Sequence, residues 1–147
     1  MPLKLARGCG SGMVGLDTNV LVRYLAQDDA RQAALATQLI EKQLSATQPG
    51  FVSLVVLVEL VWVLKRLYGA TPAELLDTVQ DLANTPQLRL ERREVVLAAA
   101  RRLTSSRPAK AGLADALVAQ LAESEGCART WTFDKAAASS CGMTLLA

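Results

Sequence analysis

Short apolar runs alternate along this chain with longer segments in which apolar residues recur every three or four positions. The short runs are Val14 to Leu16, Phe51 to Ser53 and Leu88 to Leu90. The 3.6-residue spacing between and after them predicts helices over residues 20–26, 29–44, 54–68, 72–83, 94–103 and 113–124. Short strands that alternate with helices are typical of a parallel sheet covered by helices on both faces, so the sequence predicts an α/β fold.

Cap and turn residues mark several helix ends. Ser53 is placed to cap the helix over 54–68 and Gly69 to end it, and Thr71 followed by Pro72 is the preferred order at a helix start. Thr18 or Asn19 can cap the first helix. Residues 128–133 alternate as a strand does, and 143–146 are predicted as a last strand.

Composition favours one ordinary globular domain. The 147 residues carry a formal net charge of +2, which is too small to indicate a nucleic-acid partner without local basic clusters. The three cysteines have no metal-ligand spacing, which favours a reduced cytoplasmic protein over a disulfide framework. The longest apolar run, residues 51–64, contains Glu59 and is shorter than the roughly 20 residues that cross a bilayer, so no membrane segment is expected.

The N-terminal segment has a different character from the rest of the chain. We expect residues 1–12 to form a flexible extension and residues 13–147 a single domain, with Met13 as a second possible start. Gly10, Gly12 and Gly15 match the G-x-G-x-x-G dinucleotide pattern, but a strand follows them where that motif requires a helix. The dinucleotide interpretation is therefore disfavoured.

The absence of histidine limits the chemistry that the chain can perform. Without histidine there is no Ser-His-Asp triad, no Cys-His pair and no His-x-x-x-His metal helix, so carboxylates must carry any hydrolysis. Four acids stand out: Asp17 after the first strand, Glu59, Asp115, and Asp134 after the strand over 128–133. Asp17 and Asp115 could equally be helix-start acids, and Asp134 a turn residue.

Glu59 is harder to explain structurally, because its helical neighbours at i±3 and i±4 are all apolar. This pattern predicts a buried carboxylate, which needs either a distant basic residue or a bound metal as its partner. Asp115 lies in a similarly apolar helix. Converging carboxylates repel one another, and hard divalent cations with oxygen ligands neutralise them, which favours Mg²⁺ or Mn²⁺.

The order of four short segments resembles the PIN domain family, and most of all its VapC-type toxin ribonucleases. These segments are Asp17-Thr18-Asn19-Val20-Leu21, Val58-Glu59-Leu60, Ala114-Asp115-Ala116-Leu117 and Thr132-Phe133-Asp134. The resemblance extends from Met13 over nearly the whole chain. It implies a PIN-like three-layer α/β/α sandwich with a mostly parallel central sheet.

The resemblance also implies a function and a site. It implies a metal-dependent endoribonuclease, the toxin of a toxin–antitoxin pair, with an RNA substrate, a cognate antitoxin and a homodimeric state. Asp17, Glu59 and Asp115 would be the principal catalytic and metal-binding acids, Asp134 a fourth, and Thr18 or Asn19 a supporting polar residue. Many relatives carry a further acid where this chain has Gly112, which bears on the number of metals held.

Basic residues are candidates for phosphate contacts with RNA, although each taken singly is also explained as a solvated surface charge. The candidates include Arg23, Lys65, Arg66 and Lys110, of which Arg23 lies close in sequence to Asp17. Two other classes of function stay open. One is a non-catalytic PIN-like module that binds RNA or protein, and the other is a phosphotransferase or phosphatase that uses Asp17 as a nucleophile.

Overall fold

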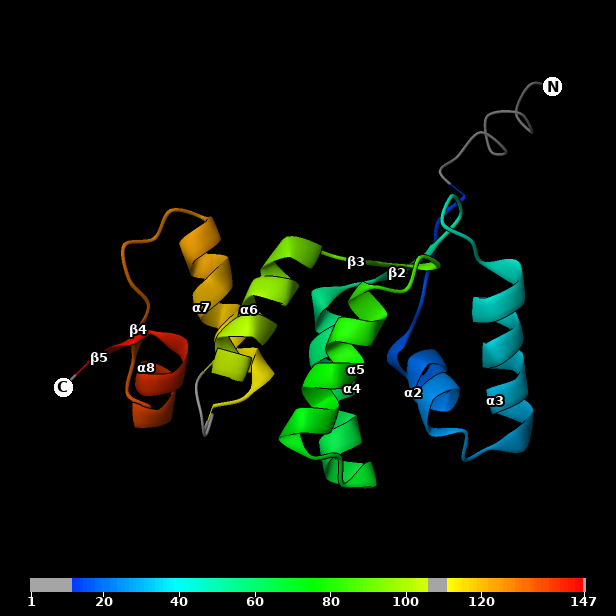
Figure 1. Ribbon diagram of the computed structural model, residues 1–147, viewed down its shortest axis with the longest axis horizontal. Helices are drawn as coiled ribbons and strands as arrows, with labels where there is room; N and C mark the ends of the chain where they lie inside the picture. Colours follow the sequence, from blue (N-terminus) through cyan, green and yellow to red (C-terminus); the bar gives the residue numbers. More distant parts are fainter. Residues whose placement is uncertain (1–11, 106–110, 147) are drawn as a thin grey trace, which may run out of the picture. The chain divides into compact units, whose positions relative to one another are not determined.

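The computed structural model describes residues 12–105 and 111–146 (Figure 1). The predicted extension over residues 1–12 lies outside the described residues except for Gly12. Two compact units are present: the first comprises the described residues up to Ala70 together with Asp81–Glu91, and the second comprises Thr71–Gln80 and the described residues from Arg92 onward. No helix among the described residues is long and apolar enough to cross a membrane.

A three-stranded parallel sheet forms the centre of the first unit. Its strands are β1 (Val14–Gly15), β2 (Gly50–Val52) and β3 (Leu88–Leu90), in the order β1-β2-β3. Val14 pairs with Gly50, and Gly50 pairs with Leu88. Because the strands are parallel, their carboxyl ends meet at one edge of the sheet, which is where α/β proteins place functional residues. Asp17 and Ser53 follow the ends of β1 and β2 at that edge.

Three helices and one π-helix pack in the first unit. They are α2 (Thr18–Ala26), α3 (Ala30–Thr37), the π-helix η1 (Gln38–Gln43) that continues α3, and α4 (Leu54–Tyr68). Helix α2 packs against both α3 and α4 (Figure 1). The fully buried side chains of this core include Leu21, Ile40, Val52, Leu57 and Leu60. Their apolar area, removed from water, stabilises the unit.

Gly50 begins β2 at a crowded point of this core. A Cβ atom at Gly50 would lie 2.6 Å from Leu16 Cδ1 and 2.9 Å from Leu44 Cδ1. Both leucines are buried. Glycine therefore allows β2 to approach β1 and the end of η1 closely.

Helix α4 has well-defined ends, and its bounds agree with the prediction from sequence. The Ser53 hydroxyl accepts a hydrogen bond from the Val56 backbone N–H, and Gly69 ends the helix in the left-handed conformation. A second acceptor caps the same end, because the Glu91 carboxylate accepts a hydrogen bond of 2.9 Å from the Leu54 backbone N–H. Glu91 follows β3, so the sheet holds the start of α4 in place.

The second unit contains three helices of its own and a two-stranded parallel sheet. They are α6 (Arg93–Ser105), α7 (Leu113–Ser124), α8 (Lys135–Cys141), β4 (Trp131–Thr132) and β5 (Thr144–Leu145). Helix α7 packs against α6 and α8 (Figure 1). Helix α5 (Pro72–Ala83) has its first residues in this unit and its last in the other.

Several predicted elements differ from the structure at their ends. Helix α2 begins at Thr18 instead of Val20, because Asp17 and not Thr18 or Asn19 is its N-cap. The helix predicted over 29–44 changes to π-helical hydrogen bonding from Gln38. The strand predicted over 128–133 is shortened to β4. Helix α8 was not predicted, since Lys-Ala-Ala-Ala-Ser-Ser-Cys has almost no apolar periodicity.

Candidate metal and RNA site

Asp17 joins β1 to α2. Leu16 is tied to β2 by a hydrogen bond from its backbone N–H to the Phe51 carbonyl, and the chain turns at Asp17 into α2. One carboxylate oxygen of Asp17, Oδ1, accepts a hydrogen bond of 2.8 Å from the Thr18 backbone N–H. The side chain is exposed. Asp17 is therefore a helix cap whose carboxylate also faces solvent at the edge of the sheet.

Thr18 connects this turn to α4. Its hydroxyl donates a hydrogen bond to Oε1 of Glu59, 41 residues away in the chain. Thr18 is buried, with 6% of its surface exposed. A buried hydroxyl needs a partner, so this bond fixes the Glu59 carboxylate next to the Asp17 turn.

The prediction that Glu59 is buried is wrong. Leu57, Leu60 and Leu64 form the buried side of α4, and the Glu59 side chain is exposed. On the exposed side lie Val55 and Trp62, which are 77% and 55% exposed. The error has a physical cause: α4 is apolar around its whole circumference, so the apolar neighbours of Glu59 do not indicate the core.

Asp17 and Glu59 line one open hollow of about 370 Å³ in the first unit. Thr18, Asn19 and Arg23, each singled out from sequence, line the same hollow. The remaining lining residues are Val22, Val63, Leu67 and Tyr68. The hollow thus combines two carboxylates, two hydroxyls, an amide and a guanidinium, all from the β1–α2 turn, α2 and α4.

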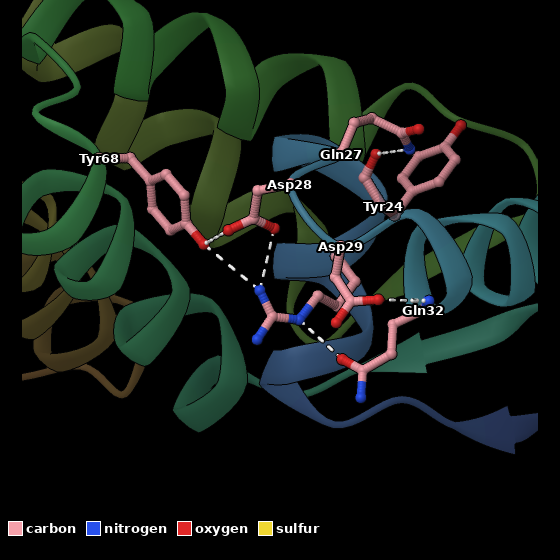
Figure 2. A network of polar contacts seen from close by, with 7 residues as sticks. Tyr24, Gln27, Asp28, Asp29, Gln32 and Tyr68 are labelled. Carbon is pink, nitrogen blue, oxygen red and sulfur yellow. Dashed lines mark hydrogen bonds and ion pairs between the residues drawn. The ribbon is translucent and has the colours of Figure 1, made fainter.

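A polar network holds Arg23 at the side of this hollow. Its Nη1 donates to the Asp28 carboxylate at 2.9 Å, and its Nε donates to the Gln32 side-chain carbonyl at 2.8 Å. The Tyr68 hydroxyl donates to the other oxygen of Asp28 at 2.5 Å, as Figure 2 shows. The Tyr68 hydrogen bond, and after it that of Arg23, holds the pKa of Asp28 below its usual range. The pKa of Tyr68 is raised by the same bond to Asp28.

Two of the other predicted RNA-binding cations do not line the hollow. Lys65 and Arg66 are exposed in the last turn of α4 and are not among its described lining residues. The Arg66 guanidinium stacks on the Trp62 ring, 5.3 Å from the ring centroid. Lys110 lies outside the described residues.

The two remaining acids belong to the second unit. Asp115 lies half-buried in the first turn of α7, and Asp134 caps α8 by accepting hydrogen bonds from the Ala136 and Ala137 backbone N–H groups. Burial raises the pKa of the Cys141 thiol, Asp115 and Asp134 raise it further, and Arg102 lowers it. Both acids therefore act on one side chain of their unit. Neither is among the residues that line the hollow of the first unit.

The sequence matches the PIN domain family over residues 14–140. This match covers most of the chain and both units. The chain belongs to the PIN domain family. The predicted α/β sandwich fold is thereby confirmed. No curated protein is similar enough to count as a relative.

PIN domains are generally metal-dependent nucleases, and they commonly use Mg²⁺ or Mn²⁺. Among the described residues of this PIN domain, no group of three or more acidic, cysteine or histidine side chains is close enough to hold a metal. The hollow nevertheless presents only oxygen ligands around Thr18, from Asp17 and Glu59. Such ligands suit a hard divalent cation such as Mg²⁺ or Mn²⁺ better than zinc, which favours nitrogen and sulfur ligands.

Asp28 and Tyr68 are the residues of this PIN domain site that sequence reasoning missed. They are separated by 40 residues. Tyr68 is the last residue of α4, a mostly apolar helix in which an aromatic residue is normally part of the core. Neither residue lies in a recognised motif, and the packing of α2 against α4 that brings them together is visible only in the structure.

Proposed function

We propose that this PIN domain is a Mg²⁺- or Mn²⁺-dependent endoribonuclease that hydrolyses phosphodiester bonds of RNA. The observation that carries the proposal is the hydrogen bond between Thr18 and Glu59, because it brings two acids of the family motif to one hollow. The resemblance of the four motif segments to VapC-type toxins supports RNA as the substrate. The same resemblance supports a role as the toxin of a toxin–antitoxin pair.

The residues of the hollow have distinct roles in this proposal. Asp17 and Glu59 would hold the metal, and the family resemblance adds Asp115 and Asp134 to the acids that the reaction uses. Thr18 fixes the orientation of Glu59 through its hydroxyl. A divalent cation bound there lowers the pKa of a coordinated water and offsets charge on the phosphate.

Replacement of Glu59 by Gln tests the proposal. Gln keeps the side-chain oxygen that accepts from Thr18 but removes the charge, so the free energy of unfolding should change by no more than about 0.5 kcal/mol. Cleavage of a labelled single-stranded RNA in Mn²⁺ should fall by about 100-fold or more, since even outer partners of metal ligands contribute 10- to 100-fold. Mn²⁺ should also raise the unfolding temperature of wild type more than that of Glu59→Gln.

Glu41→Gln is the matched control, because Glu41 accepts a hydrogen bond from Tyr24 and does not line the hollow. This variant should cleave RNA as wild type does.

Asp115→Asn and Asp134→Asn should lose the Mn²⁺ stabilisation if both acids hold the same ion. Full cleavage by Glu59→Gln would contradict the site. Wild-type protein that leaves RNA intact would favour a non-catalytic RNA- or protein-binding module.

A further inference from the structure

Arg23 is the only cation among the described residues that line the hollow. About a third of its side chain, 33%, is exposed. A guanidinium carries five N–H donors in one plane. Nε is used by Gln32 and Nη1 by Asp28, while no hydrogen bond to Nη2 is found within the described parts of the chain. Donors are thus left for a ligand.

We propose that Arg23 binds a phosphate of the RNA strand in this hollow, and that Asp28, Gln32 and Tyr68 are positioning residues that hold its guanidinium there. The inference rests on the nuclease function proposed above. Arginine suits this task because its planar donors match phosphate oxygens in pairs.

The partners of Arg23 determine where its charge lies. Its ion pair is with Asp28, and within the described residues it forms none with Asp17 or Glu59. Asp28 is itself held by the Tyr68 hydroxyl, and Gln32 fixes Nε from α3. Held at two nitrogens, the guanidinium stays at the side of the hollow, where its charge is paired with Asp28 and not with the two acids.

This fixation also prepares Arg23 for binding. A free arginine side chain loses rotamer freedom when it contacts a ligand, and one that is already held loses less. Asp28 offsets part of the Arg23 charge. Within the described residues no hydrogen bond involves Nη2, so this nitrogen can donate to a phosphate. Tyr68 positions Arg23 through Asp28 and through a hydrogen bond of 3.5 Å that its hydroxyl accepts from Nη1 of Arg23.

The test uses a background variant, Asp17→Asn with Glu59→Gln, which removes the acids that repel RNA without metal. Asn keeps the helix cap at position 17. Binding of a short single-stranded RNA is measured in chelator over a range of salt concentrations. Adding Arg23→Gln should reduce the slope of log K against log salt by about 0.7, the value for one phosphate contact on a single strand.

Kinetics on the protein with intact acids provide a second readout. Arg23→Gln should raise KM about tenfold with kcat changed less than threefold, as expected when one charge-assisted contact is lost from substrate and transition state alike. Tyr68→Phe should raise KM by a smaller factor. Arg23→Lys should not restore KM, because lysine lacks the paired donors.

Two control variants separate this role from general effects. Tyr24→Phe removes another tyrosine–carboxylate bond of the first unit, and Arg31→Gln removes an exposed cation on α3; neither residue lines the hollow. Both should leave the salt slope and KM unchanged.

An unchanged slope and KM in Arg23→Gln, or no RNA binding by the background variant, would overturn the phosphate contact. Identical behaviour of Tyr68→Phe and Tyr24→Phe would overturn the positioning role. If wild type cleaves no RNA, the nuclease proposal fails, while the slope still reports on Arg23.

Discussion

At the scale of single residues, Thr18 determines how the hollow is built. Its side chain is buried, and its hydroxyl is satisfied by a carboxylate from another helix. Its backbone N–H is satisfied by Asp17. One residue therefore bonds both acids, and loss of the hydroxyl alone would release Glu59 while leaving the Asp17 cap intact.

The Asp28 network gives a prediction about pH. Because the pKa of Asp28 is lowered from its ordinary value of 3.8, its interactions stabilise the fold above that pH and are lost as the pH falls through the lower folded value. Tyr68→Phe removes the hydrogen bond that lowers the pKa of Asp28 most, so it should raise this pKa toward 3.8. Carboxyl NMR titration measures this directly. A pKa for Asp28 at or above 3.8 in wild type, or an equal shift in Tyr24→Phe, would contradict the network.

Sequence reasoning at this scale depended on motifs. The motif segments include Asp17, Thr18, Asn19 and Glu59, and all four line the hollow. The exposure of Glu59 could not be predicted, because α4 is apolar on every side. Asp28 and Tyr68 could not be predicted either, since their contact depends on tertiary packing between distant segments.

At the scale of elements, caps explain which boundaries could be predicted. Helices α4 and α7 and strand β3 have the predicted bounds, and Ser53 and Gly69 do cap α4. The apolar residues of helix α8 are all small, and Asp134 caps the helix, so periodicity did not reveal it. Periodicity detects helices through their buried side, whereas a short helix held by its cap gives little signal.

Gly50 gives the prediction at this scale. Gly50→Ala places a methyl group against Leu16 and Leu44 and should cost about 1–3 kcal/mol of unfolding free energy, as overpacking does in cores. Gly15→Ala in the paired strand is the control, because a Cβ there meets nothing within 4 Å. Urea unfolding of the two variants compares them. Equal stabilities would show that the leucines move aside without cost.

At the scale of the whole molecule, the family match spans both units, while the structure assembles only part of the motif within one of them. The first unit contains Asp17, Glu59 and the Arg23 network, and the second contains Asp115 and Asp134. The order of the motif segments along the sequence predicts that all four acids belong to one site. The family, and not the geometry of either unit alone, supports their joint action.

The toxin role predicts an effect on cells. Expression of wild-type protein alone in a bacterial host should arrest growth, whereas Glu59→Gln should not and Glu41→Gln should. Coexpression of a small antitoxin with basic side chains on its tail should relieve the arrest, because such a tail complements the acids. Sedimentation would test the proposed homodimer. Normal growth with wild-type protein and intact RNA would exclude a toxin.

The hydrogen bond from Leu54 to Glu91 marks the last part of the chain that the first unit needs. A ribosome makes the chain from its N-terminus, and compact regions can fold as they emerge. The hollow with Asp17 and Glu59 can therefore form while residues 115 and 134 have not yet been synthesised. If cleavage uses Asp115 and Asp134, as the proposed function has it, activity begins only after residue 134 has been synthesised, although the hollow is already formed.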